Sequence, residues 1–69
     1  MSWLIKRSFT LAGHRTSVAL EAEFWEILEE AASAQGRSLA GLVSEIDADR
    51  SSDRPLASSL RLHALKWVR

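Results

Sequence analysis

The sequence changes from a strand pattern to a helix pattern within residues 13–25, which read GHRTSVALEAEFW. In the first half of this stretch polar and apolar side chains alternate, so Thr16, Val18 and Leu20 share one face of a strand. After Leu20 the apolar side chains instead recur every three to four residues, and five glutamates between residues 21 and 30 occupy the opposite side. A short strand therefore leads directly into an amphipathic helix.

This strand needs a partner, because its backbone donors and acceptors must be paired and its apolar face must be covered. The preceding segment, residues 7–12, also alternates, with Phe9 and Leu11 on one face. It can fold back as a hairpin through a type II′ turn at Gly13-His14. Alternatively, a second copy of the chain supplies the same strand across a two-fold axis, or both pairings occur together.

Three helices are expected after the strand, over residues 21–35, 38–50 and 55–68. Ser38 is a good N-cap, because its hydroxyl can accept a hydrogen bond from a free amide of the first turn. Pro55 suits the start of the third helix, where its missing N–H costs no hydrogen bond. Each helix carries an apolar stripe at helical spacing. We therefore expect the helices to pack against one another.

The 69 residues form a single domain that is too small to bury a large core. At this size only about 60% of the unfolded surface is buried, and the lack of cysteine excludes disulfides. Yet 46% of the residues are hydrophobic and three are tryptophan. We expect a homodimer that pairs through the ribbon strand at residues 15–20, with residues 1–6 as an N-terminal arm that frays or packs on the partner.

The charges are segregated along the chain although their sum is zero. Residues 1–20 and the last nine residues carry bases without acids, whereas residues 21–30 carry five glutamates without a base. A neutral chain gives no support to non-specific nucleic-acid binding by the whole molecule. The N-terminal bases form either a functional basic ribbon or an ordinary solvated face.

Several short motifs are similar to those of a known family. These are KRS at 6–8, GHRTS at 13–17, FW at 24–25, ID at 46–47 and SSLR at 58–61. With the order of strand, helix, short glycine-containing connection and helix, they resemble the ribbon-helix-helix superfamily of bacterial DNA-binding dimers. More narrowly, the chain resembles a family of short, largely uncharacterised bacterial ribbon-helix-helix proteins over nearly its whole length.

The resemblance implies a mainly α fold with a short β ribbon, that is, a ribbon-helix-helix dimer with an additional C-terminal helix. Two copies would pair their strands antiparallel above interlocked helices. In DNA-binding members the outward side chains of the ribbon enter the major groove, which admits two strands. The implied function is that of a DNA-binding transcriptional regulator.

The implied DNA contacts begin with the outward strand positions Arg15, Ser17 and Ala19. Arg15 would read guanine with two hydrogen bonds, and Ser17 would donate to or accept from several bases. Amides at the start of the second helix would bind a phosphate. Lys6 and Arg7 would add phosphate contacts that strengthen binding to all sequences. The predicted DNA-binding residues are Lys6, Arg7, Arg15, Ser17, Ser38 and Leu39.

A hairpin would create a difficulty for this interpretation. If residues 7–12 pair with residues 15–20, the dimer has four strands, which at about 4.8 Å per strand is too wide for a groove of about 12 Å. The alternative is a module that keeps the dimer fold but senses a small carboxylate or amino acid, or binds protein. Its arginine would hold the carboxylate in a bidentate contact. The predicted ligand-binding residues are His14, Arg15, Thr16, Ser17 and Trp25.

A third interpretation is purely structural, in which the turn residues only cap the hairpin and pair with nearby glutamates. An enzyme is not expected, because no nucleophile accompanies a base and an acid, and the glutamates lie on a helix surface without a cleft. No cofactor or metal site is expected either. No apolar run is long enough to cross a bilayer and no signal peptide is visible, so we expect a cytoplasmic protein without a membrane partner.

Overall fold

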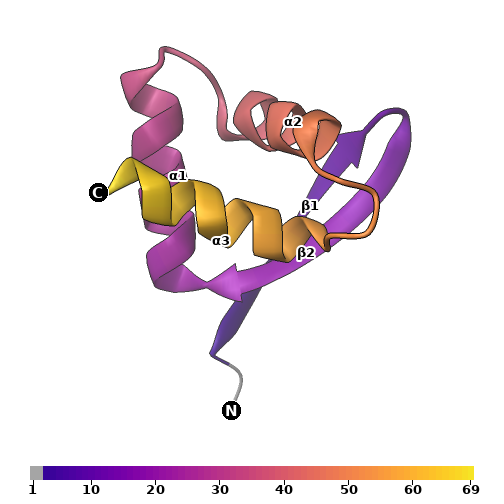
Figure 1. The fold of residues 1–69 in the computed structure, drawn as a ribbon, viewed down its shortest axis with the longest axis horizontal. Coiled ribbons are helices and arrows are strands. Elements are labelled where there is room, and N and C mark those ends of the chain that lie inside the picture. The colour runs from indigo at the N-terminus through magenta and orange to yellow at the C-terminus, as the bar shows by residue number, and fades with distance from the viewer. Residues whose placement is uncertain (1–2) are drawn as a thin grey trace.

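The computed structural model describes residues 3–69, which form a two-stranded antiparallel hairpin followed by three helices (Figure 1). The elements are β1 (Leu4–Leu11), β2 (His14–Glu21), α1 (Ala22–Ala34), α2 (Leu39–Asp49) and α3 (Leu56–Trp67). The expectation of a mainly α fold with a short β ribbon and an additional C-terminal helix is confirmed. All three helices pack on the same face of the hairpin.

The hairpin settles how the strand of residues 15–20 is paired within one chain. β1 pairs with β2 in a register that places Ser8 opposite Ser17 and Leu11 opposite His14. The connecting loop is therefore Ala12-Gly13, and both residues have positive φ, +50° and +81°. These angles are those of a type I′ turn, so the expected type II′ turn at Gly13-His14 is wrong. His14 is not in the turn: it is the first residue of β2 and pairs with Leu11.

The expected N-terminal arm is also corrected, because its last three residues are part of β1. β2 continues to Glu21, so Leu4 pairs with Glu21 and Ile5 pairs with Leu20. The indole Nε1 of Trp25 donates a hydrogen bond to the Ile5 carbonyl oxygen at 2.7 Å. This segment is thus fixed to its own chain. Met1 and Ser2, which belong to the expected arm, lie outside the described residues.

The helix ends follow the capping residues. α1 ends at Ala34, and Gly36 just beyond it has a φ of +66°, a conformation that favours glycine. Ser38 caps α2 as expected, because its Oγ accepts a hydrogen bond from the Gly41 amide at 3.0 Å. Pro55 directly precedes α3. Gly36 and Ser38 thus mark the short connection between α1 and α2.

One hydrophobic core joins all five elements. Its buried side chains include Trp25 and Leu28 of α1, Leu42 of α2 and Leu60 of α3, together with the apolar residues of the hairpin's inner face. No polar or charged residue is buried in the described part of the chain. A single chain therefore closes its core without a partner strand.

Candidate nucleic-acid interface

The two faces of the hairpin have opposite chemistry. Because side chains alternate along a strand, the register assigns the even positions of β1 and the odd positions of β2 to one outer face. The outer-face residues are Leu4, Lys6, Ser8, Thr10, Arg15, Ser17, Ala19 and Glu21. The inner-face side chains Phe9, Leu11, Val18 and Leu20 are buried beneath the helices. The outer face is the part of the hairpin that a large partner can reach.

Hydroxyl and guanidinium groups are ordered across the outer face. The Ser8 and Ser17 Oγ atoms lie 2.9 Å apart and share a hydrogen bond. Next to them the Arg15 Nη1 donates to Thr10 Oγ1 at 3.5 Å. Both pairs are direct cross-strand neighbours. Because an arginine has five N–H donors, Arg15 retains most of them for another partner.

Glu21 is the one carboxylate among these eight outer-face residues, at the open end of the hairpin. Arg61 of α3 donates to its Oε1 from Nε at 3.1 Å and from Nη2 at 2.9 Å. The pKa of the Glu21 carboxyl is lowered from its ordinary value, first by its own backbone N–H and then by the Arg61 guanidinium. The negative charge of Glu21 is thus balanced by Arg61. The other seven residues of the outer face include no acid.

Arg7 lies on the inner face and does not belong to this surface. Its Nη1 is 2.6 Å from Glu29 Oε1, and its guanidinium lies 5.1 Å from the centre of the Trp25 ring. The prediction that Arg7 contacts DNA therefore does not agree with its position. Lys6 does lie on the outer face, opposite Ala19.

Ser38 and Leu39 are also separated from the outer face. α2 covers the inner side of the hairpin, and Leu39 is partly buried against the core. The Ser38 hydroxyl is bonded to the Gly41 amide, and Arg37 Nη2 donates to the Gly41 carbonyl at 3.0 Å. The amides at this helix start therefore lie on the opposite side of the sheet from Arg15. One chain does not bring the two predicted contact regions together.

The residues of the alternative ligand site are not gathered in one cavity. Thr16 is on the inner face, opposite Phe9, whereas Arg15 and Ser17 are on the outer face. Trp25 is only 1% exposed and packs against Phe9 with ring centres 5.9 Å apart. His14 is exposed beside the turn. The structure thus offers no common pocket for a carboxylate at these residues.

A groove that the sequence analysis did not anticipate lies between α2, the following loop and α3. It encloses about 360 Å³, and its charged lining residues are Glu45, Asp49, Arg50, Arg54, His63 and Lys66. Arg50 is used within the chain, where it binds Asp47 Oδ1 at 2.9 Å and the Arg54 carbonyl at 2.9 Å. Because the groove is lined by both acids and bases, its charge favours neither an anionic nor a cationic ligand.

Two further features concern the described residues only. Within residues 3–69, no cluster of three or more histidine, aspartate or glutamate side chains could hold a metal ion. None of the helices in this range is both long and apolar enough to cross a membrane.

Comparison with known proteins places this arrangement among ribbon-helix-helix domains. A family model described as "Ribbon-helix-helix domain" matches residues 4–68. Among solved structures, an uncharacterized protein from Bordetella pertussis Tohama I is similar, with a TM-score of 0.80 and 30% identity over 94% of this chain. The match covers 55% of the Bordetella protein, so this chain spans about half of its length. No curated protein matches the chain.

Proposed function

The chain belongs to the ribbon-helix-helix domain family, and on this basis we propose that it is a DNA-binding protein that acts as a transcriptional regulator. Its DNA-contacting element is the outer face of the β1–β2 hairpin. One chain supplies both strands of this ribbon. The role is recognition, and no catalytic residue is assigned.

One observation supports this proposal, namely that the outer face carries two bases and three hydroxyls, and that its one acid is paired with Arg61. Two strands about 4.8 Å apart are narrow enough for a major groove about 12 Å wide. A basic, hydroxyl-rich surface is attracted to phosphates and can donate to base edges. The zero net charge of the chain does not oppose this, because every glutamate except Glu21, which is paired with Arg61, lies on a helix.

Each outer side chain has a role that follows from its chemistry. Arg15 is the candidate base reader, since a guanidinium pairs with guanine O6 and N7. Ser17 and Ser8 are adjacent hydroxyls that can donate or accept. Lys6, nearer the open end, is the candidate phosphate contact. Ala19 offers only an apolar contact.

The expected dimer through the ribbon strands competes with this mode of binding. In a hairpin with a two-residue loop, the backbone groups of Arg15, Ser17 and Ala19 point away from β1. This edge could accept β2 of a second copy, but the resulting four-stranded sheet is broader than the groove. We propose that the form that binds DNA keeps this edge unpaired.

The proposal is tested by selecting duplexes from a random library and measuring affinity by fluorescence anisotropy at several salt concentrations. Arg15→Ala should cost about 1–3 kcal/mol on the selected sequence and relax the preference at one base pair. Lys6→Ala should weaken binding to all duplexes and reduce the salt slope by about 1.

The matched control is Arg54→Ala, which removes one positive charge from the loop between α2 and α3. It should leave affinity and preference close to wild type. The proposal fails if no duplex is selected, or if Arg54→Ala weakens binding as much as Lys6→Ala does.

A further inference from the structure

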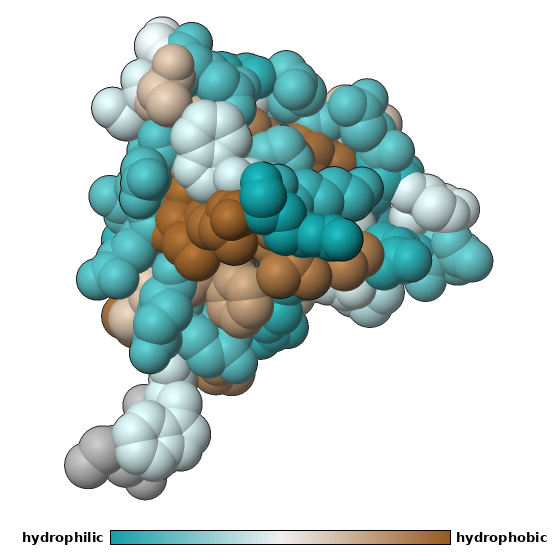
Figure 2. Space-filling model, turned by 60° about the vertical axis from the view of Figure 1, so that its left-hand side comes forward, coloured by the Kyte–Doolittle hydropathy of each residue, from teal (hydrophilic) through white to brown (hydrophobic). Residues whose placement is uncertain are grey.

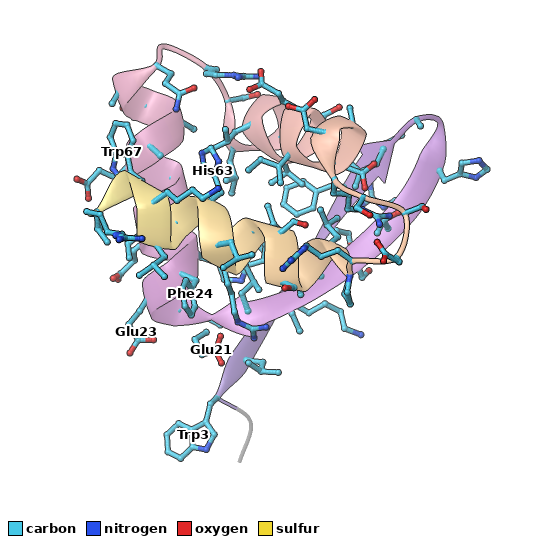
Figure 3. The ribbon with its side chains drawn as sticks, viewed as in Figure 1. Trp3, Glu21, Glu23, Phe24, His63 and Trp67 are labelled. Atoms are coloured by element: carbon cyan, nitrogen blue, oxygen red, sulfur yellow. The ribbon has the colours of Figure 1, made fainter. Side chains whose placement is uncertain are left out.

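The groove between α2 and α3 is lined on one side by a single face of α3. Its lining residues there are Ser59, Leu62, His63 and Lys66, whose spacing places them on the same side of the helix. Figure 3 shows His63 on the side of α3 that faces α2. The groove differs from the hydrophobic patch that Figure 2 shows where α1 meets α3, because it combines apolar residues with charged groups of both signs.

The charged groups lie at different positions along the groove, because the two helices run in opposite directions (Figure 1). Asp49 is the last residue of α2 and lies next to the loop that leads into α3. Lys66 lies near the end of α3 that is farthest from this loop. Ile46 and Leu62 line the groove between these two ends, since each precedes the charged residue of its own helix by about one turn.

Several other charged residues of the lining are already engaged within the chain. Glu45 pairs with Arg37, with its Oε2 2.5 Å from the guanidinium Nη1. Arg50 donates to one carboxylate and to two backbone carbonyls. Arg54 donates from Nη1 to the Ser58 hydroxyl at 3.1 Å. These side chains are therefore partly or fully occupied.

The charged groups at the two ends of the groove are free. Within residues 3–69, the side chains of Asp49, His63 and Lys66 form no hydrogen bond or ion pair. Asp49 and Lys66 thus line one groove without pairing with each other, and both are exposed. The groove encloses about 360 Å³, which is within the range of about 300–1,000 Å³ for small-molecule sites. A ligand that satisfies both ends must carry a cation and an anion.

We propose that this groove binds a small zwitterion, namely a free amino acid whose two charges lie at opposite ends of an apolar chain. Asp49 binds the ammonium group, and Lys66 binds the carboxylate with His63 beside it. The apolar chain lies over Ile46 and Leu62. One helical turn spans about 5 Å, so the two ends are too far apart for an ammonium and a carboxylate on one carbon atom. The site lies on the helical side of the sheet, away from the proposed DNA contacts.

The test is an NMR titration of the ¹⁵N-labelled full chain, in which amide chemical shifts report both the affinity and the site. The probe is 6-aminohexanoate, and its shifts should be confined to residues 45–50 and 59–66. Hexanoate and hexylamine have the same chain length but only one charge each. They should bind at least about tenfold more weakly, because each loses one charge-assisted hydrogen bond. L-Norleucine, an isomer with both charges at one end, should also bind more weakly.

Two substitutions assign the ends of the ligand. Asp49→Asn should weaken binding of 6-aminohexanoate about tenfold and leave hexanoate unaffected, because hexanoate has no ammonium group. Lys66→Gln should weaken both ligands. Glu26→Gln is the matched control, since it also removes one exposed negative charge but lies on α1, outside the groove. It should leave both affinities close to wild type, and circular dichroism checks that each variant keeps the fold.

Three results would overturn the proposal. The first is the absence of shifts at the groove with 6-aminohexanoate. The second is tighter binding of adipate, in which a carboxylate replaces the ammonium group, because this would assign the groove to dianions held by Arg54 and Lys66. The third is equal weakening by Asp49→Asn and Glu26→Gln. DNA binding is measured separately, so failure here leaves the hairpin proposal standing.

Discussion

Ser8 and Ser17 face each other across the hairpin with their hydroxyl oxygens 2.9 Å apart, in the middle of the outer face. Because both side chains are exposed, replacing either with alanine should lower the free energy of unfolding by less than about 1 kcal/mol. DNA preference should nevertheless change with Ser17→Ala. Urea unfolding and duplex selection on the same variant measure the two effects, and a large loss of stability would mean that the pair is structural.

Arg7→Ala should destabilise the chain by about 1 kcal/mol without a specific effect on DNA. The ion pair with Glu29 is partly exposed and worth little, but the guanidinium also packs over Trp25. Arg7→Lys keeps the charge while losing the planar contact, so it should restore only part of the stability. A tenfold loss of DNA affinity at unchanged stability would instead show that Arg7 contacts DNA.

Trp25→Phe should destabilise the chain by about 1–3 kcal/mol, because it removes volume from the core and the indole N–H that donates to the Ile5 carbonyl. The loss should be uneven along the chain. Amide hydrogen exchange should accelerate most at the beginning of β1. Equal acceleration throughout the molecule would show that the indole hydrogen bond has no local role.

Ala12→Gly should stabilise the hairpin by up to about 1 kcal/mol, because Ala12 has a φ of +50° that an L-residue with a side chain adopts at a cost. Gly13→Ala should have the opposite effect. No atom lies within 4 Å of a Cβ built at Gly13, so the penalty there is conformational and not steric. Thermal unfolding of the two variants provides the comparison, and shifts of the same sign would contradict a type I′ turn.

The Glu21–Arg61 pair should make stability depend on pH in the acid range. The pKa of the Glu21 carboxyl is lowered in the folded chain by its own N–H and by Arg61, so the charged form stabilises the fold above the ordinary glutamate pKa. This contribution is lost as the pH falls through the lowered pKa. Arg61→Gln should therefore flatten the decline of stability below about pH 5. Urea unfolding across a pH series would show parallel curves if the pair were unimportant.

The sequence predicts much of the fold because its local signals agree. Alternation at Thr16, Val18 and Leu20 correctly assigns the buried face of β2, and Ser38 caps α2 as expected. The turn could not be assigned correctly, since Gly13 fits both a type I′ and a type II′ loop. The choice depends on the pairing of Leu11 with His14, which is a property of the complete register.

The candidate site was less predictable, because it depends on which side of a strand each residue occupies. Lys6 and Arg7 are adjacent in the sequence, yet the register sends them to opposite faces. The apolar ring of Trp25 could line a ligand site, but in the structure it packs against Phe9 and is buried. The outer face depends on the pairing of β1 with β2, which no local pattern in either strand specifies.

The hydrogen bond from the Trp25 indole to the Ile5 carbonyl closes the end of the hairpin opposite the turn. The strands are therefore held together by the turn at one end and by Trp25 of α1 at the other. Separating them at the open end requires that the hydrogen bond to α1 break. The backbone of the hairpin is already ordered before any partner arrives, so association loses less conformational entropy than it would with a free arm. If the outer face binds DNA as proposed, we expect Trp25 to raise its affinity although the indole is buried on the other side of the sheet.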